Sequence, residues 1–328
     1  MKKLISLLLV VAMLLSLGAC AKPEANGPTN KTNVNVFVLT GPTGIGAVNF
    51  MERAASLNGG EVYNFTAVKE PTEIVAKISN KQADIAAVPT NLAASLYNKT
   101  SGGVKVLAVN TLGVLYVLTN KGTEIASISD LKGKKVVTTG QGSNPEYILN
   151  YILSKNGINK DTDLTIEYKA SGEELVPVWA TDPSAIIIAP QPVATNIKGK
   201  YEGAKQALSL TDEWQKIDSE SALMQGCVVV RTEFLEANPT AVENFLKEYK
   251  ASIETAQTDI EGTAALCEKH GMVPKAAVAK AALPFVGLCY IDGAEMKTKL
   301  SGFLNVMFAA DPKSVGGKLP GEDFWYEK

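Results

Sequence analysis

Val38-Leu39-Thr40-Gly41 and Val137-Thr138-Thr139-Gly140 are two copies of one pattern, in which an apolar strand runs into a glycine loop that a helix follows. A second pair comes later in the same order, since Ile85 to Ala93 (IAAVPTNLA) matches Ile186 to Ala194 (IIIAPQPVA). A strand, a glycine turn and a helix in succession are common, but two matching pairs in the same order are harder to attribute to chance. The repetition therefore predicts two α/β lobes of similar build.

The regions around these pairs indicate the class of fold. Short apolar runs alternate with helical periodicity along most of the chain, which is typical of α/β proteins with parallel strands. Two apolar stretches, 112–120 (LGVLYVLTN) and 225–231 (QGCVVVR), are expected to cross between the lobes. We therefore predict a two-lobed α/β fold, in which each lobe is a mostly parallel sheet flanked by helices. Lobe I is discontinuous, with residues 34–112 and 228–328, and lobe II comprises residues 113–227.

Open parallel sheets bind ligands outside the carboxyl ends of their strands. In this chain several of those ends open helices, whose unpaired backbone N–H groups would face a gap between the lobes. Thr90 and Asn144 are expected as helix N-caps, the latter with Pro145 at the first helical position. Two lobes that face each other in this way can close on a small molecule. The candidate ligand-binding residues are Gly41, Pro42, Thr43, Gly44, Thr90, Asn91, Thr111, Gln141, Gly142, Ser143, Asn144 and Gln191.

Each of these loop residues also has a purely structural explanation. Gly41, Gly44 and Gly46 suit turns and helix–sheet packing, and their spacing lacks the ending of a P-loop and the third glycine of a Rossmann motif. Capping alone would explain Thr90 and Asn144. The sequence therefore leaves a ligand role and a folding role open for these loop residues.

The first residues carry the pattern of a bacterial export signal. In residues 1–19 a positive start precedes the apolar run from Leu4 to Leu15, which is too short to span a bilayer. Leu17-Gly18-Ala19-Cys20 resembles the lipobox, which implies that Cys20 receives diacylglycerol; an ordinary signal peptide with a chance cysteine is the alternative. Residues 20–33 contain no large apolar side chain and are expected to form a flexible tether. The expected location is extracytoplasmic, with a lipid anchor on the outer face of the cell membrane.

Composition and cysteine usage exclude several classes of protein. A formal net charge of −2 and an apolar fraction of 46% fit a globular protein that binds no nucleic acid. Cys227, Cys267 and Cys289 match no metal-binding spacing and are favoured as small buried hydrophobes. At most one pair of them can form a disulfide, and which pair, if any, stays open. We predict neither a metal nor a cofactor.

Catalytic machinery is not evident either. His270 is the only histidine and follows a helix-end signal, which argues against a zinc site or a Ser-His-Asp triad. An extracellular enzyme would need a poised acid–base pair, and nothing in the sequence pairs Glu70 or Glu173. Arg53 and Arg231 both fall outside the candidate loops, so a bidentate arginine grip on a carboxylate or phosphate is disfavoured. We therefore predict a binding protein rather than an enzyme.

These features together resemble a type II periplasmic-binding-fold protein, the solute receptor of an ABC importer. Within that group the chain is similar to the nitrate/sulfonate/taurine and thiamine-pyrimidine-precursor binding family, although it lacks the cysteine-rich signature of the thiamine-precursor members. The resemblance implies a ligand between the lobes, contacted by the loops named above. The stretches that carry it are Gly41 to Gly46 (GPTGIG), Gln82 to Ala86 (QADIA), Ser129 to Val136 (SDLKGKKV) and Phe234 to Val242 (FLEANPTAV).

The leading hypothesis is an extracytoplasmic solute-binding lipoprotein of an ABC importer. It would bind a small polar or anionic molecule, such as a sulfonate, nitrate or a pyrimidine precursor, and deliver it as a monomer to the permease and ATPase subunits. Recognition of an anion would rest on helix N-termini and hydroxyls, with Lys69 as a nearby cation. The alternative is a ligand-sensing lipoprotein of the same fold that acts with a partner receptor.

Overall fold

The computed structural model describes residues 31–327, and Thr32–Lys328 form one compact unit. The expected signal peptide (residues 1–19), Cys20 and nearly all of the expected tether lie outside the described residues. Within residues 31–327, no helix combines the length and the apolar character needed to cross a membrane.

The first sheet has the strand order β11-β4-β10-β3-β1-β2. β1 pairs in parallel with β2 and β3, whereas β10 is antiparallel to β3 and β4. β1 begins earlier than the expected Val34, because its parallel pairing with β2 extends to Thr32 and Glu61, so Thr32 and Asn33 belong to the sheet and not to the tether. The strands are β1 (Thr32–Leu39), β2 (Glu61–Val68), β3 (Ile85–Pro89), β4 (Val104–Leu112), β10 (Met224–Arg231) and β11 (Leu288–Ile291).

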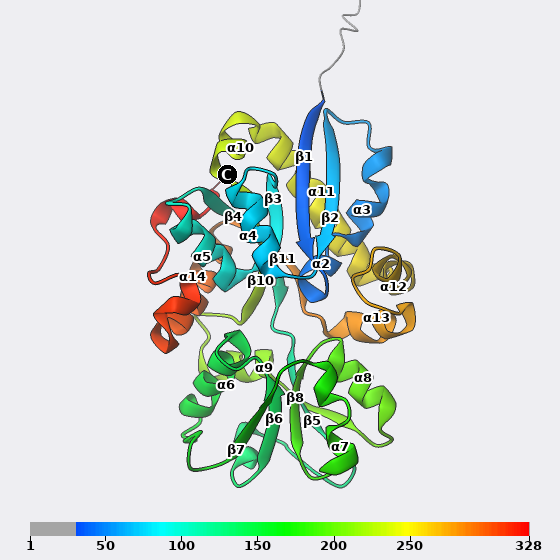
Figure 1. Cartoon of the computed structure of the whole chain (residues 1–328), viewed down its shortest axis with the longest axis vertical. Helices are drawn as coiled ribbons and strands as arrows, with labels where there is room; N and C mark the ends of the chain where they lie inside the picture. Colours follow the sequence, from blue (N-terminus) through cyan, green and yellow to red (C-terminus); the bar gives the residue numbers. More distant parts are fainter. Residues whose placement is uncertain (1–30, 328) are drawn as a thin grey trace, which may run out of the picture. The chain divides into compact units, whose positions relative to one another are not determined.

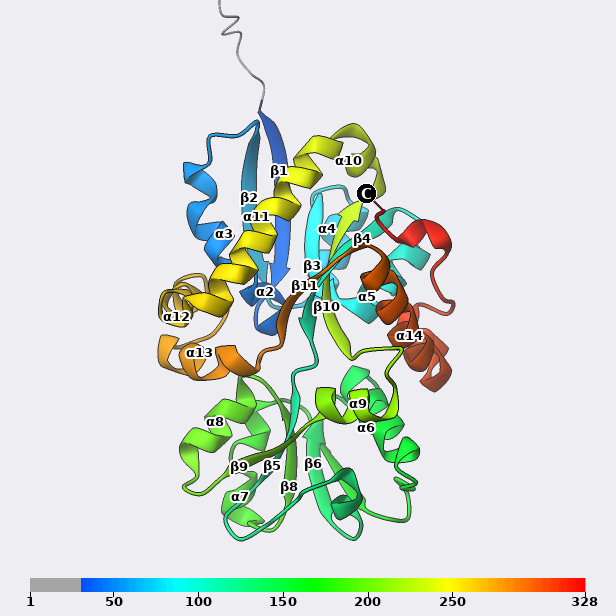
Figure 2. The same cartoon turned by 180° about the vertical axis from the view of Figure 1, so that it is seen from behind.

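The second sheet has the strand order β7-β6-β8-β5-β9. β6 pairs in parallel with β7 and β8, and β5 is antiparallel to β8 and β9. Each sheet is mixed: most of its strands run in one direction, but β10 and β11 run the other way in the first sheet and β5 does so in the second. Helices flank each sheet, as Figures 1 and 2 show. The predicted two-lobed α/β fold is confirmed. The strands are β5 (Leu115–Thr119), β6 (Lys135–Thr139), β7 (Thr165–Lys169), β8 (Ile186–Pro190) and β9 (Lys205–Ser209).

The chain passes from the first sheet to the second between β4 and β5 and returns before β10 (Figure 2). The single strand expected over residues 112–120 is wrong, because β4 ends at Leu112 and β5 begins at Leu115. A Cβ atom on the intervening Gly113 would lie 2.3 Å from Thr211 Oγ1 and 2.7 Å from Leu223 Cδ2. A side chain at this position would therefore displace the side chains of Thr211 and Leu223.

Helices cover both faces of the first sheet and surround the second (Figure 1). In the first lobe, α3 packs against α11 and α12, and α5 packs against α14. The α-helices are α2 (Pro42–Ile45), α3 (Val48–Arg53), α4 (Pro71–Ser79), α5 (Thr90–Lys99), α6 (Asn144–Lys155), α7 (Val178–Thr181), α8 (Val193–Lys200), α9 (Leu210–Ile217), α10 (Thr232–Ala237), α11 (Pro239–Thr258), α12 (Ile260–Lys269), α13 (Ala276–Ala282) and α14 (Gly293–Ala310). The 3-10 turns are η1 (Ala54–Ser56), η2 (Ile128–Leu131), η3 (Glu173–Leu175), η4 (Leu283–Phe285), η5 (Pro312–Val315) and η6 (Glu322–Phe324).

One hydrophobic cluster runs through both lobes. It joins residues under the first sheet to α6 and α9 of the second lobe, and α14 packs directly against α6. Within it the rings of Trp214 and Phe303 are 5.6 Å apart, and both side chains are fully buried.

Trp179 belongs to a separate cluster of the second lobe and donates a hydrogen bond to the Ala185 carbonyl at 2.7 Å. Trp179 is therefore a core residue.

Two helix starts differ by one residue from the expected positions. Pro89, not Thr90, is the N-cap of α5, and Ser143, not Asn144, is the N-cap of α6. Thr90 and Asn144 are thus the first residues of their helices, and Pro145 occupies the second position of α6. The Ser143 backbone is extended (φ −142°), which places the transition into the helix at that residue.

Candidate functional site

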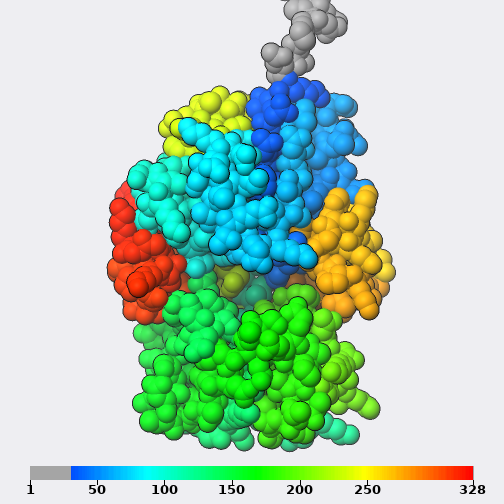
Figure 3. Space-filling model, viewed as in Figure 1, coloured from blue at the N-terminus to red at the C-terminus, as the bar shows by residue number. Residues whose placement is uncertain are grey.

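The candidate loops follow the carboxyl ends of strands in both sheets. In the first sheet these are the ends of β1, β3 and β4, and in the second the ends of β6 and β8. Figure 3 shows a hollow in the face of the molecule between the blue and cyan part and the green part, with deeper atoms at its floor. This is the edge at which open α/β sheets place ligands.

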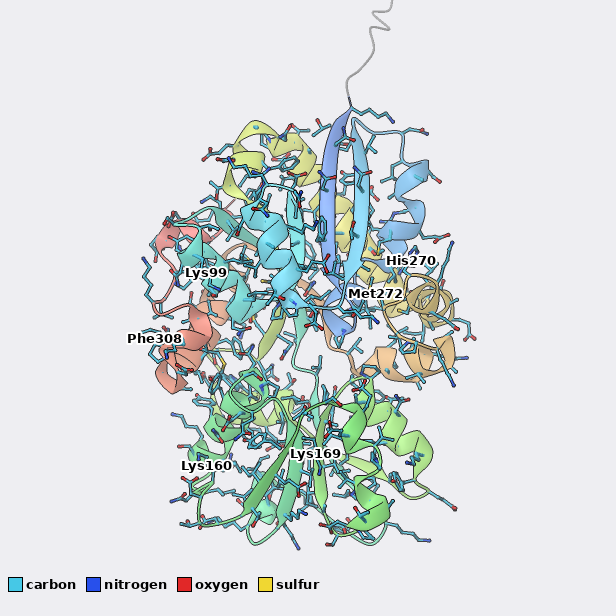
Figure 4. The ribbon with its side chains drawn as sticks, viewed as in Figure 1. Lys99, Lys160, Lys169, His270, Met272 and Phe308 are labelled. Carbon is cyan, nitrogen blue, oxygen red and sulfur yellow. The ribbon has the colours of Figure 1, made fainter. Side chains whose placement is uncertain are left out.

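The loop after β1 depends on glycine at two positions for different reasons. Gly41 adopts φ 88° and ψ −159°, a conformation that is nearly restricted to glycine, and no atom lies within 4 Å of where its Cβ would be. A Cβ on Gly44 would lie 2.1 Å from the Leu39 carbonyl oxygen and 2.8 Å from Met272 Sδ, and Figure 4 labels Met272. Close packing therefore explains Gly44, whereas Gly41 borders open space.

Thr43 and Thr111 join a buried polar network under the same loop. Asn110 Nδ2 donates to the Thr43 carbonyl at 3.0 Å and to the Tyr249 hydroxyl at 2.7 Å. Thr111 Oγ1 donates to Asn110 Oδ1 at 2.9 Å, and Asn110, Thr111 and Tyr249 are fully buried. Sequence reasoning missed Asn110 and Tyr249, because no local pattern connects a strand residue with a distant helix. The network fixes the position of the Thr43 backbone.

Thr90 and Asn91 open α5. The Thr90 hydroxyl is fully buried and donates to the Met224 carbonyl at 2.6 Å, so it is occupied within the protein. Asn91 Nδ2 donates to the Ser314 carbonyl at 3.3 Å. This bond fixes the orientation of the Asn91 amide and turns its Oδ1 toward the second lobe.

The loop that precedes α6 contains two glycines with left-handed backbone. Gly140 and Gly142 have φ values of 81° and 71°, and Gln141, Gly142 and Ser143 are exposed. The Gly142 N–H donates to Glu146 Oε2 at 2.6 Å, and the Ser143 hydroxyl donates to the Gly140 carbonyl at 2.7 Å. The loop is thus held by its own hydrogen bonds while its outer surface faces solvent.

Asn144 bridges the two lobes. Its Nδ2 donates to Asn91 Oδ1 at 3.1 Å, and its side chain is buried with 5% exposure. Because Ser314 fixes the Asn91 amide, Asn144 must present Nδ2 to it, and Asn144 Oδ1 has no hydrogen-bond partner among the described residues. Four other buried side-chain atoms share that property: Asn98 Oδ1, Asn150 Oδ1, the Tyr201 hydroxyl and Thr211 Oγ1. Of the five, Asn144 is the one whose side chain reaches from a candidate loop to the opposite lobe.

Gln191 is buried at the end of β8 and precedes a cis peptide bond to Pro192. Its Oε1 accepts hydrogen bonds from the Thr195 backbone N–H at 3.3 Å and hydroxyl at 2.8 Å, and its Nε2 lies 3.5 Å from Gln206 Oε1. Gln191 therefore caps the start of α8 through side-chain contacts that the sequence did not reveal.

The charged residues around the candidate loops include carboxylates as well as lysines, since Glu146 accepts the Gly142 N–H. Both arginines are paired elsewhere, Arg53 with Glu248 at 3.0 Å and Arg231 with Asp84 at 2.9 Å. Lys69 is exposed after β2, and Lys169 ends β7 in a 2.5 Å ion pair with Glu167 (Figure 4). Because parallel strands end at one edge, Lys169 is a cation on the ligand-facing edge of the second sheet that sequence reasoning missed.

The side chains considered for catalysis lie apart from one another on the surface. His270 Nε2 lies 3.0 Å from Glu52 Oε2 on the surface of the first lobe, where Figure 4 labels His270. Glu70 and Glu173 are exposed in different lobes. Within the described part of the chain, no group of His, Cys, Asp or Glu is arranged to hold a metal ion. Cys227, Cys267 and Cys289 are unpaired, and burial raises the pKa of the Cys267 and Cys289 thiols to about 12.

A well-formed cavity of about 310 Å³ lies on α11, away from the candidate loops. It contains both carboxylates and lysines, and Lys250 lies 5.6 Å from the centre of the Tyr290 ring. It shares no residue with the candidate loops. Its lining residues are Glu243, Leu246, Lys247, Lys250, Tyr290 and Asp292. The candidate loops lie instead at the carboxyl ends of strands, where helices begin.

Comparison with solved structures identifies the fold. An ABC transporter from Parabacteroides distasonis is 23% identical, with a TM-score of 0.75 over 91% of this chain and 100% of that one. The periplasmic aliphatic sulphonate binding protein SsuA from Escherichia coli is 14% identical, with a TM-score of 0.70 over 90% and 92%. A putative periplasmic sulfonate-binding protein from Methylobacillus flagellatus is also 14% identical, with a TM-score of 0.65 over 91% and 92%. At these identities the likeness is one of fold.

A family model identifies the class of protein. No curated protein matches the chain. The model described as "ABC transporter, phosphonate, periplasmic substrate-binding protein" matches residues 56–257, which is more than half of the sequence. This confirms the resemblance to solute-binding proteins of ABC transporters. The chain therefore belongs to the phosphonate-type family of periplasmic substrate-binding proteins of ABC transporters.

Proposed function

We propose that this chain closes on a small anionic molecule, of the phosphonate or sulfonate type, in the gap between its two sheets and delivers it to a membrane permease. The observation that carries the proposal is the meeting of two helix starts across the gap. Asn144, the first residue of α6, donates from Nδ2 to Oδ1 of Asn91, the second residue of α5, at 3.1 Å. Helix N-termini attract anions through unpaired N–H groups and the helix dipole.

Neutral donors carry the recognition in this proposal. Arg53 and Arg231 are held in ion pairs elsewhere, so helix N-termini and the exposed loop Gln141–Ser143 must supply most of the contacts. Lys69 adds positive charge at the edge of the first sheet, whereas Lys169 at the edge of the second is paired with Glu167. The unpartnered Asn144 Oδ1 further favours a ligand that carries a donor, such as a singly protonated phosphonate, because a buried acceptor without a partner is destabilising.

Thermal unfolding of the full chain with candidate anions tests the proposal. Methylphosphonate, methanesulfonate, phosphate, sulfate and nitrate are compared at millimolar concentration, because binding to the native state raises the melting temperature. We expect at least one anion to raise the melting temperature. If none of them does so, the anion-binding proposal is wrong.

A pair of asparagine variants tests the place of binding. Asn144→Ala removes the bridge and the free acceptor, and we expect it to weaken anion binding about tenfold, in line with the loss of one hydrogen bond to a charged ligand. Asn150→Ala is the matched control, since Asn150 lies on the same helix and also has a buried Oδ1 without a partner among the described residues. Equal loss of affinity in both variants would place the ligand elsewhere.

The lipid anchor on Cys20 completes the proposal, and a lipid-anchored receptor would stay near its permease. Its support is the sequence Leu17-Gly18-Ala19-Cys20. Cys20→Ser is expected to move the protein from the membrane fraction into the soluble fraction, whereas Cys227→Ser leaves it in the membrane fraction.

Ligand-dependent uptake by cells that carry the permease would separate import from sensing, because a sensing lipoprotein does not accumulate solute.

A further inference from the structure

Tyr147 has two hydrogen-bond acceptors, one in each lobe. Its hydroxyl lies 2.9 Å from Asp311 Oδ2, just beyond α14 in the first lobe. It also lies 3.2 Å from the carbonyl oxygen of Gly142, in the loop that precedes its own helix. A tyrosine hydroxyl carries one proton, so it donates fully to only one of these acceptors at a time.

Asp311 is held rigidly on the first lobe. Its Oδ1 accepts the Lys313 N–H at 2.9 Å and so caps η5, which leaves Oδ2 for Tyr147. α5 in turn holds η5, because Asn91 donates to the Ser314 carbonyl at 3.3 Å and Asn98 to the Val315 carbonyl at 2.9 Å. The acceptor that faces Tyr147 is therefore a fixed carboxylate, and hydrogen bonds to ionised acceptors are about twice as strong as neutral ones.

The Tyr147 hydroxyl stays protonated in this place. Burial, and then the hydrogen bond to Asp311, raise the pKa of Tyr147 above its ordinary value. Tyr147 follows Asn144 by one helical turn. The bond from Asn144 to Asn91 and the bond from Tyr147 to Asp311 therefore both connect the N-terminal end of α6 to the first lobe. A further hydrogen bond between the lobes, from the Tyr116 hydroxyl to the Phe285 carbonyl at 2.7 Å, has a neutral acceptor.

We propose that Tyr147 and Asp311 form a latch that holds the two lobes together. The Tyr147 hydroxyl keeps its proton and donates its hydrogen bond to Asp311 while the lobes are together, and to the Gly142 carbonyl when they part. Because the hydroxyl keeps an acceptor in both states, parting leaves no unsatisfied donor, and the difference between a charged and a neutral acceptor sets the balance. The latch deepens the proposed function by naming what retains the ligand, since Gly142 belongs to a candidate ligand loop.

Small-angle X-ray scattering from the full chain without ligand tests the latch. Tyr147→Phe keeps the ring and removes the hydroxyl, and we expect the population with parted lobes to rise about three- to tenfold, as a larger radius of gyration. Tyr151→Phe is the matched control. Tyr151 lies one turn further along α6, and its hydroxyl bonds to Asp218 at 3.3 Å within the second lobe, so its scattering should equal that of the wild type. A Tyr147→Phe profile equal to that of the wild type would overturn the latch.

A double-mutant comparison identifies the partner. Asp311→Asn keeps an oxygen that can cap η5 and removes the charge, so we expect partial opening of the lobes. Tyr147→Phe combined with Asp311→Asn should open them no further than Tyr147→Phe alone, because both changes act on one bond. Additive effects would contradict the pairing.

Dissociation of methylphosphonate, measured by stopped flow, connects the latch to function. Release should be about three- to tenfold faster from Tyr147→Phe than from Tyr151→Phe, and equal release rates would show that the latch does not retain ligand. The scattering experiment needs no ligand. If no anion binds, the proposed function fails while the latch still stands or falls on its own result.

Discussion

At the scale of single residues, tertiary hydrogen bonds separate the candidate residues into two groups. The hydroxyls of Thr90 and Thr111 are buried and already donate to the Met224 carbonyl and to Asn110 Oδ1. Asn144 Oδ1 has no partner among the described residues, and Gly142 faces solvent. Residues that looked equivalent as loop polar groups therefore differ in what they can offer a ligand.

Gly44 is expected to be the most sensitive glycine of the first loop. Gly44→Ala would place Cβ 2.1 Å from the Leu39 carbonyl oxygen, and such overpacking should lower the free energy of unfolding by about 3 kcal/mol. Urea unfolding measures the change. Gly199→Ala is the control, because Gly199 lies in α8 with open space around its Cβ position, and alanine there should be neutral or stabilising by up to about 1 kcal/mol. Similar losses in both variants would contradict the packing argument.

At the scale of secondary-structure elements, local patterns predicted which elements exist but not where they end. The expected strand over residues 112–120 is divided, because β4 ends at Leu112 in the first sheet and β5 begins at Leu115 in the second. The return segment before β10 is organised by Asp218, whose Oδ1 accepts the N–H groups of Glu220 and Ser221, both at 3.0 Å. Such turns join elements through contacts that apolar periodicity does not encode.

Asp218 should make this return segment sensitive to acid. Burial raises the pKa of Asp218, but hydrogen bonds from Ser221 and Glu220 outweigh burial and hold the pKa below its ordinary value of 3.8. A carboxyl whose folded pKa is lowered stabilises the protein above its ordinary pKa, and this contribution is lost as the pH falls through the folded pKa. We therefore expect Asp218→Asn to be less stable than the wild type at pH 7, with a difference that shrinks below about pH 4. Urea unfolding across this range measures it, and a difference independent of pH would contradict the assignment.

At the scale of the whole unit, the two lobes share a hydrophobic cluster as well as two covalent crossings. Trp214 of α9 packs at 5.6 Å on Phe303 of α14, and α14 also contacts α6. Phe285 of η4, in the first lobe, packs against a separate hydrophobic cluster of the second lobe. Motion between the lobes must preserve or break these contacts, so they constrain how far the lobes separate.

Phe303→Ala should destabilise the whole unit rather than one lobe. The ring is fully buried, and its removal leaves a cavity between α14 and α9, which costs about 3–5 kcal/mol. Denaturant unfolding followed by tryptophan fluorescence measures this loss. Phe308→Ala is the control on the same helix, because Phe308 is only half-buried and should cost less (Figure 4). Equal losses would show that Phe303 does not join the lobes.

Two α/β lobes with glycine loops after matching strands could be predicted from the chain alone. Strand and helix periodicity, glycine turns and the doubled pattern at Thr40-Gly41 and Thr139-Gly140 are local features, and burial of apolar faces follows from them. The helix starts expected at Thr90 and Asn144 were predicted to within one residue, since cap preferences are local too.

The partners of each polar group were decided only when the chain folded. Asn110 meets Tyr249, Asn144 meets Asn91, and Tyr147 meets Asp311 across long stretches of sequence. A hydrogen bond depends on positions and angles to within a few tenths of an ångström, and no local pattern of residue types specifies them. For this reason the sequence predicted the two lobes. It did not predict that Asn144 Oδ1 lacks a partner among the described residues, or that the Tyr147 hydroxyl has one acceptor in each lobe.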